Sequence, residues 1–235
     1  MHFDKAFIIG LPSHTNKRLE RCFKRCEREG VDAKLWSGIY GPDVDIKDYQ
    51  NKGYLASDFE LQLPGSLGCM LSHITLWEAL EKDPDCEIAL ICEDDILLKD
   101  NFLKNLAAIP WSEVPDDWDI IKLSYHKPDG KQISDHIIKP SLSTKRGTNS
   151  GTFCYLMKAS SAQILKGILA PYNGKRSMDV LLRENFSQFN PYLTKNILAI
   201  EERYRYSIRK DLNLRVKKST VLDRLFVKIT KFFFP

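Results

Sequence analysis

The sequence contains no long hydrophobic run. No stretch approaches the roughly 18 apolar residues that a membrane-spanning helix needs. An apolar run of signal-peptide length is also absent after Met1, because Lys5, His14, Lys17 and Arg18 interrupt it. Hydrophobic residues make up 43% of the chain and charged residues 28%, as is usual for soluble globular proteins. We therefore expect a cytoplasmic protein without a membrane-spanning segment.

Paired cysteine motifs are absent too. The chain has six cysteines, but none forms a C-x-x-C pair and none has a histidine at zinc-finger spacing. Most of them lie within apolar periodic segments, so we expect reduced thiols packed in the core, and we interpret Cys69 in this way. No internal repeat or low-complexity segment occurs in the 235 residues, which are enough for one large or two small domains.

An acidic triplet follows the most buried-looking strand of the sequence. Five apolar residues at 88–92 predict a strand buried on both faces, and Glu93, Asp94 and Asp95 come directly after it. In an extended chain Glu93 and Asp95 would share one face, with α-carbons roughly 6.5 Å apart, and Asp94 would point away. This spacing predicts a divalent-cation site; the alternatives are a solvated acidic turn and, for Asp94, an N-cap of the next segment.

Strands and helices alternate along the chain. Apolar runs predict strands at 6–11, 34–36, 88–92, 119–124 and 152–157. Helical spacing predicts helices at 19–29, 67–80, 101–108, 159–169 and 178–184. The polar residues 40–64 predict a surface excursion, and residues 127–150 predict a long loop that covers a site. This order predicts an α/β fold with a mostly parallel sheet covered by helices.

The basic charge is concentrated at the end of the sequence. Residues 203–235 contain ten Lys/Arg and two Asp and therefore have a net charge of +8. The preceding 202 residues have a net charge of −4, and the whole chain has +4. Apolar residues between 221 and 233 have helical spacing with basic residues between them. We expect an amphipathic tail at 211–235 that contacts an anionic membrane surface, not nucleic acid. The alternative is a terminal helix that packs on its own domain or on a partner.

Several segments resemble a known family, glycosyltransferase family 25, which includes bacterial lipooligosaccharide glycosyltransferases and procollagen galactosyltransferases. The resemblance covers about residues 3–210, and its two most specific segments are 68–73 (Gly-Cys-Met-Leu-Ser-His) and 90–95 (Leu-Ile-Cys-Glu-Asp-Asp). Weaker matches occur at 8–18, 36–41, 151–156, Asp179 and 206–208. Two positions depart from the family pattern: Gly10 replaces an asparagine, and Glu93 makes an E-x-D motif where many such enzymes have D-x-D.

This resemblance implies a GT-A-like fold at 1–210 and an inverting transfer of a hexose, most often galactose, from a UDP-sugar to a lipooligosaccharide or lipopolysaccharide core acceptor. It implies Mn²⁺ or Mg²⁺ held by Asp95 and Glu93, an ion that would neutralise the leaving diphosphate. Because the acceptor is lipid-linked, we expect the protein at the cytoplasmic face of the inner membrane. A glucosyltransferase of the same pathway is the alternative.

Inversion in one displacement needs one base for the acceptor hydroxyl. The resemblance makes Asp179 the candidate, and a helix-capping or first-turn role is its alternative. Glu201 and Glu202 are weaker candidates. Asp94 is expected to touch the sugar or orient its loop.

Donor-binding residues are expected at the start of the chain and in the 68–73 segment. They comprise Leu11, Lys17, Arg18, Ser72 and His73, together with Glu93 and Asp94. The lysine and arginine would bind uridine or diphosphate as cations; a solvated helix start is the alternative for them, and a structural role is the alternative for Ser72 and His73.

Two other classes of function remain open at this stage. A nucleotidyltransferase or metal phosphohydrolase could use the same acids, but residues 11–15 are not the glycine-rich phosphate loop expected of a sugar nucleotidyltransferase. A catalytically inactive binding module is the third possibility, and intact Glu93, Asp95 and Asp179 argue against it.

Overall fold

The computed structural model describes residues 3–63, 65–142 and 147–202. The chain divides into two units, Met1–Tyr204 and Arg205–Pro235. The predicted amphipathic tail at 211–235 and the matching segment at 206–208 lie outside the described residues, so both stay predictions. No helix within the described residues is both long and apolar enough to cross a membrane.

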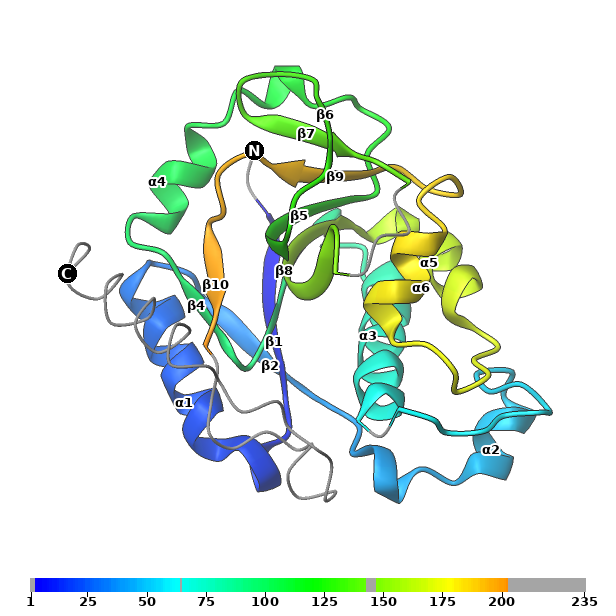
Figure 1. Ribbon diagram of the computed structural model, residues 1–235. Coiled ribbons are helices and arrows are strands. Elements are labelled where there is room, and N and C mark those ends of the chain that lie inside the picture. Colours follow the sequence, from blue (N-terminus) through cyan, green and yellow to red (C-terminus); the bar gives the residue numbers. More distant parts are fainter. Residues whose placement is uncertain (1–2, 64, 143–146, 203–235) are drawn as a thin grey trace, which may run out of the picture. The chain divides into compact units, whose positions relative to one another are not determined.

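A sheet of eight strands forms the centre of the first unit (Figure 1). Its order across the described residues is β2 (Ala33–Ser37), β1 (Lys5–Gly10), β3 (Ile88–Glu93), β8 (Ser150–Lys158), β5 (Ile120–His126), β9 (Pro191–Thr194), β7 (Ile137–Pro140) and β6 (Gly130–Gln132). Two further strands, β4 (Ile96–Leu98) and β10 (Ala199–Glu201), pair antiparallel beside it.

Most strands of the sheet share one direction. β1 pairs parallel with β2 and β3, and β5 pairs parallel with β9. β8 runs against both β3 and β5, and β7 runs against β9 and β6. The carboxyl ends of β1, β3 and β5 therefore meet the beginning of β8 at one edge of the sheet.

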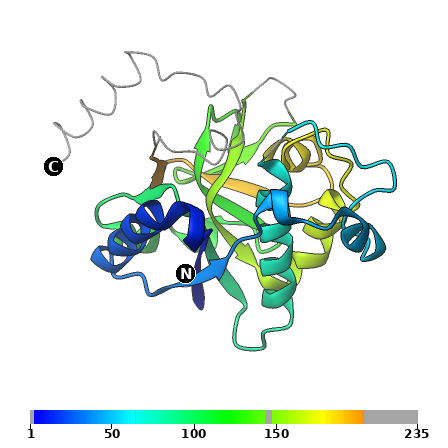
Figure 2. The ribbon, with the colours of Figure 1, turned by 90° about the horizontal axis from the view of Figure 1, so that it is seen from below.

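Helices cover both faces of this sheet, as Figures 1 and 2 show. On one face, buried side chains of α1 (Pro12–Arg28) and α4 (Phe102–Ala107) pack against β1, β3 and β5. On the other, α3 (Ser66–Glu81), α5 (Ala162–Leu169) and α6 (Met178–Glu184) enclose the second part of the core. The short α2 (Ile46–Asn51) lies within the polar excursion after β2.

The predicted α/β fold class is confirmed, and so are the main strands and helices. The prediction of a plain loop at 127–150 was wrong, because β6 and β7 form an antiparallel hairpin within this segment. The extended chain predicted for the acidic triplet was also wrong: Asp94 and Asp95 form a turn into β4. Since a strand follows that turn, the N-cap alternative for Asp94 is excluded.

Candidate active site

Carboxylates from several elements lie at the carboxyl edge of the sheet. Glu93 is the last residue of β3, and Asp94 and Asp95 form the turn that follows it. Asp179 lies in the first turn of α6, next to the start of β8. Ligand sites of open α/β sheets lie at such edges. The edge predicted from the sequence therefore contains the acids predicted for it.

Glu93 faces α3 and β8. Its Oε1 accepts a hydrogen bond from the Thr152 hydroxyl at 2.9 Å and lies 3.6 Å from Nε2 of His73. Burial raises the pKa of Glu93, but His73 and Thr152 more than offset this, so its net shift is downward. His73 and Thr152 thus favour the ionised form of Glu93.

Asp94 is buried and pairs with Arg18 of α1. Burial raises the pKa of Asp94, and the guanidinium of Arg18 limits the rise. A Cβ on Gly10 would lie 2.8 Å from Cδ1 of Leu19 and 3.3 Å from Cβ of Asp94. The departure of Gly10 from the family asparagine therefore accompanies a close approach of Asp94 to β1.

Asp95 lies on the same side as Asp94, within 3.9 Å of Arg18. Its Oδ1 is buried and has no hydrogen-bond partner among the described residues. Burial, followed by the charge of Glu93, raises the pKa of Asp95 well above its usual range. Glu201, on β10, adds to the same negative field. The turn brings Asp95 into a cluster of like charges that a cation would relieve.

The carboxylates fit a hard divalent cation. Mn²⁺ and Mg²⁺ prefer oxygen ligands, and the buried, unpartnered Oδ1 of Asp95 near the carboxylate of Glu93 offers such donors. The metal-ligand roles of Asp95 and Glu93 stay predictions.

Asp179 is held by the residues around it. Its carboxylate accepts hydrogen bonds from the Ser177 hydroxyl at 2.6 Å and from the amide of Gly151 at 3.3 Å. The charge of Asp179 acts on both Glu93 and the buried Lys122. Burial lowers the pKa of Lys122 to about 8. Asp179 thus occupies a first helical turn, as the structural alternative holds, and also belongs to the carboxylate cluster.

The segment 68–73 packs closely against the loop that follows β2. A Cβ on Gly68 would lie 2.3 Å from the carbonyl oxygen of Ile39 and 2.8 Å from the amide of Gly41, so only glycine lets α3 approach the loop after β2 this closely. Ser72 is buried, accepts from the amide of Ile39 at 2.8 Å and donates to the carbonyl of Gly68 at 2.6 Å. Ser72 thereby positions the loop, and its donor contact stays a prediction.

His73 is fully buried and fixed by two aromatic residues. Its Nδ1 lies 2.7 Å from the hydroxyl of Tyr155, which also accepts from the indole of Trp77 at 3.0 Å. Its Nε2 has no hydrogen-bond partner among the described residues and points to Glu93. His73 is therefore oriented toward the acidic cluster by its surroundings.

The remaining predicted residues lie at the start of α1. Leu11 is the N-cap of this helix, and its amide bonds to the Thr15 hydroxyl at 3.2 Å. Lys17 is exposed, whereas Arg18 is directed inward to Asp94. Of the two weaker base candidates, Glu201 lies 3.3 Å from His126 and Glu202 lies 3.6 Å from Arg21. Lys17 thus lies in solvent, and Arg18 lies against the buried carboxylate of Asp94.

Three residues beside the candidate site were not predicted from the sequence: Lys122, Thr152 and Tyr155. Lys122 and Tyr155 are buried in mostly apolar strands, where a single charged or hydroxyl-bearing side chain could have indicated a role.

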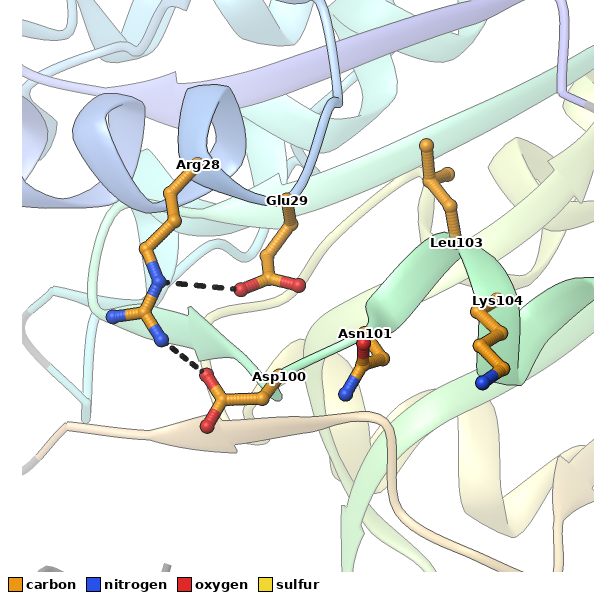
Figure 3. A pocket seen from close by; sticks show the side chains of 6 residues that line it. All are labelled: Arg28, Glu29, Asp100, Asn101, Leu103 and Lys104. Atoms are coloured by element: carbon orange, nitrogen blue, oxygen red, sulfur yellow. Dashed lines mark hydrogen bonds and ion pairs between the residues drawn. The ribbon is translucent and has the colours of Figure 1, made fainter. Parts of the chain in front are cut away.

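A surface depression of about 440 Å³ lies elsewhere, between the end of α1 and the start of α4 (Figure 3). Three of its charged side chains lie together: Arg28 binds Asp100 at 2.6 Å and lies 3.7 Å from Glu29. This depression contains none of the predicted site residues.

Comparison with known proteins identifies the family. The family model described as glycosyltransferase family 25 (LPS biosynthesis protein) matches residues 3–182. Relatives include procollagen galactosyltransferase 1-A of Xenopus laevis, 26% identical over 52% of this chain and 21% of its own length, and procollagen galactosyltransferase 2 of Homo sapiens, 22% identical over 71% and 28%. A probable inactive glycosyltransferase 25 family member 3 of Rattus norvegicus is 25% identical over 52% and 23%. The chain thus spans about a fifth to a quarter of these relatives.

Solved structures show distant likeness. A glycosyltransferase involved in glycosylation of the major capsid of PBCV-1 has a TM-score of 0.44 and 12% identity, covering 80% of this chain and 79% of that one. A Drosophila β1,4-galactosyltransferase 7 mutant, in complex with manganese, UDP-Gal and xylobiose, has a TM-score of 0.43 and 10% identity over 94% and 79%. The assignment rests on the family model: this chain belongs to glycosyltransferase family 25.

Proposed function

We propose that this chain is an inverting, metal-dependent glycosyltransferase that transfers galactose from UDP-galactose to a lipooligosaccharide or lipopolysaccharide core acceptor. The observation that carries the proposal is the buried carboxylate cluster at the carboxyl edge of the sheet. Asp95 has an unpartnered oxygen there and a pKa raised well above its usual range. Such strained charges concentrate at functional sites.

The metal would be Mn²⁺ or Mg²⁺, held by Asp95 and Glu93, and it would neutralise the leaving diphosphate. Arg18 supports the same end of the site, because it offsets the charges of Asp94 and Asp95. Lys17, one residue earlier and exposed, is proposed to reach the diphosphate or uridine. Leu11, Ser72 and His73 would shape the donor site around them, and Asp94 would orient the turn or contact the sugar.

Asp179 is the proposed base. Its carboxylate accepts hydrogen bonds from the hydroxyl of Ser177 and the amide of Gly151, which orient it at the start of α6. The acceptor oxygen would attack the anomeric carbon while the bond from that carbon to the diphosphate breaks. UDP leaves with the bonding electrons, and the acceptor proton passes to Asp179. One displacement of this kind inverts the anomeric centre.

The test is calorimetric titration of UDP-galactose and UDP-glucose into the full chain with Mn²⁺, and then with excess EDTA. Saturable binding that chelation removes is the expected result, with UDP-galactose the tighter ligand. Tighter binding of UDP-glucose would favour the glucosyltransferase alternative. Absence of binding to either sugar nucleotide would reject the transferase and favour a different phosphate substrate or a binding role.

Membrane association of the tail is a separate part of the proposal. The acceptor is expected to be lipid-linked, and residues 203–235 carry a net charge of +8. Deletion of residues 216–235 should weaken binding to anionic liposomes and leave transfer to a soluble acceptor unchanged. Lipid binding that survives the deletion would contradict a membrane role for the tail. The location at the cytoplasmic face of the inner membrane depends on this result.

A further inference from the structure

A second set of possible metal ligands lies beside the carboxylates, and its chemistry is different. Cys69, His73 and Glu93 each offer one ligand atom, and these atoms lie within 4.8 Å of one another. The set contains one sulfur, one nitrogen and one oxygen. We propose that these three residues form a site for a thiophilic divalent ion, Zn²⁺ being the type case, which shares Glu93 with the Mn²⁺ or Mg²⁺ site expected at Asp95.

The helix geometry brings two of the ligands together. Cys69 and His73 are four residues apart on α3, so their side chains lie one turn apart on the same face. This is the spacing by which a single helix supplies two ligands to one zinc ion. Glu93, at the end of β3, then closes the site from the sheet. The sequence pattern does not reveal this arrangement, because Glu93 lies 20 residues after His73 and on a different element.

The distances suit tetrahedral zinc. Zinc bonds of about 2.0–2.1 Å to nitrogen and oxygen place two such ligands about 3.4 Å apart at the tetrahedral angle. Nε2 of His73 and Oε1 of Glu93 are 3.6 Å apart, so an ion fits between them with little movement. The Sγ of the half-buried Cys69 lies within 4.8 Å of the ligand atoms that His73 and Glu93 offer.

The surroundings of His73 favour a metal ligand. Its Nε2 is fully buried and has no hydrogen-bond partner among the described residues, although it points into the cluster. Its Nδ1 lies 2.7 Å from the hydroxyl of Tyr155, which the indole of Trp77 holds in place. A metal-bound histidine typically donates its other ring N–H to a fixed partner of this kind. With an ion at Nε2, the ring proton would lie on Nδ1 and donate to Tyr155.

The donor set determines which ion binds. Thiolate and imidazole select zinc and related ions, whereas Mg²⁺ and Mn²⁺ prefer carboxylates. Binding would transfer the thiol proton of Cys69 to solvent, because the thiolate is the ligand. If the proposed function holds, the bound ion would also withdraw Glu93 from the donor site, and zinc would compete with the sugar nucleotide.

Cobalt titration of the full, untagged chain tests the site without any sugar nucleotide. Co²⁺ substitutes for Zn²⁺ and shows an absorption band of thiolate-to-cobalt charge transfer in the near ultraviolet. We expect this band to saturate at one equivalent of Co²⁺, to vanish on addition of Zn²⁺, and to persist in excess Mg²⁺. Absence of the band would overturn the proposal.

Variants locate the ligands. Cys69→Ala should abolish the band and weaken Zn²⁺ binding in calorimetry by about a hundredfold or more, since loss of even an outer-shell partner costs about 10–100-fold. Cys86→Ala, which removes a buried cysteine outside the cluster, should leave both unchanged. A band that survives in Cys69→Ala, or that disappears in Cys86→Ala, would place the site elsewhere and reject the proposal. Circular dichroism of each variant checks the fold, and Cys69→Ser provides a second, more conservative removal of sulfur.

This test is independent of the proposed transfer reaction. Failure of donor binding together with a normal cobalt band would reject the transferase and keep the metal site. Normal Mn²⁺-dependent donor binding without a cobalt band would do the reverse.

Discussion

Helix α1 forms an arginine–aspartate ion pair toward each of its ends, and the two pairs differ in burial. At its start, Arg18 pairs with Asp94, and the two side chains are only 14% and 6% exposed. At its end, Arg28 pairs with Asp100, and these side chains are 61% and 38% exposed. The second pair lines the depression in Figure 3, and the first is not among the residues that line it.

The difference favours desolvated charge over a surface hollow as the marker of the proposed site. Exposed ion pairs contribute about 0–1 kcal/mol, because water already solvates each partner. Buried carboxylates are costly, and they persist where surrounding structure or a ligand offsets the cost. The unpartnered oxygen of Asp95 therefore supports the proposed site at the first end, whereas Arg28 and Asp100 at the second end satisfy one another.

Substitution of the carboxylate at each end should break the comparison most clearly. Asp95→Asn should abolish Mn²⁺-dependent binding of UDP-sugars, a loss of at least about a hundredfold, because the amide is a poor metal ligand. Asp100→Asn should leave that binding unchanged. Both are measured by calorimetry with the wild-type chain as reference. Equal affinity in Asp95→Asn and the wild type would remove Asp95 from the metal site.

Asp95→Asn should at the same time stabilise the fold. The pKa of Asp95 is raised in the folded state, so folded protein binds more protons than unfolded chain above the ordinary pKa. Stability is therefore lost as pH rises through the folded-state pKa, and the asparagine avoids this loss. The gain at neutral pH should raise Tm; an unchanged or lower Tm would contradict the strained charge.

Removal of the arginine at each end compares the two ion pairs directly. Arg18→Met leaves Asp94 buried without its cation, which should lower the free energy of unfolding by about 3–5 kcal/mol. Arg28→Met should lower it by about 0.5 kcal/mol or less, since that guanidinium is 61% exposed. Urea denaturation of both variants provides the measurement. Similar losses in the two variants would mean that burial does not separate the pairs.

Close packing beside the site gives a smaller effect. Gly68→Ala would place a methyl group against the backbone of Ile39 and Gly41 and should cost about 2–3 kcal/mol. Gly167 on α5 is the matched control, because nothing lies within 4 Å of a Cβ there. Gly167→Ala should stabilise by up to about 1 kcal/mol, since alanine favours helix. Thermal unfolding that ranks the two variants otherwise would contradict the close approach of α3.

The buried cation near Asp179 extends the comparison to pH. Lys122 has its pKa lowered from 10.5 to about 8 by burial. Below about pH 8 both states are charged and the folded state bears the full cost; between about 8 and 10.5 only the unfolded chain keeps the proton, so stability rises with pH. Relative to Lys122→Met, the wild type should gain about 2 kcal/mol between pH 7 and pH 10. Urea curves at both values check this, and a constant difference would show an unshifted lysine.

Prediction from the sequence succeeded where local pattern and burial agree. The run 88–92 was recognisable as a buried strand because no polar residue interrupts it, and α3 was recognisable by its apolar spacing. The hairpin of β6 and β7 was not predicted because its strands are short: β6 has three residues, all exposed, and β7 has four, too few to show a strand pattern. The ion pair of Arg18 with Asp94 was not predicted for a related reason. Toward the start of a helix, residue spacing alone does not distinguish a solvated cation from a paired one.

The sequence by itself determined the α/β order, the acidic triplet after β3 and the family, because these depend on periodicity and on short motifs. Only the tertiary structure decided that the chain turns at Asp94, that Asp179 joins Glu93, and that Cys69, His73 and Glu93 converge. Those interactions join residues up to 86 positions apart, as in the charge interaction between Glu93 and Asp179. Sheet pairing and helix packing bring such residues together, and neither leaves a local mark in the sequence.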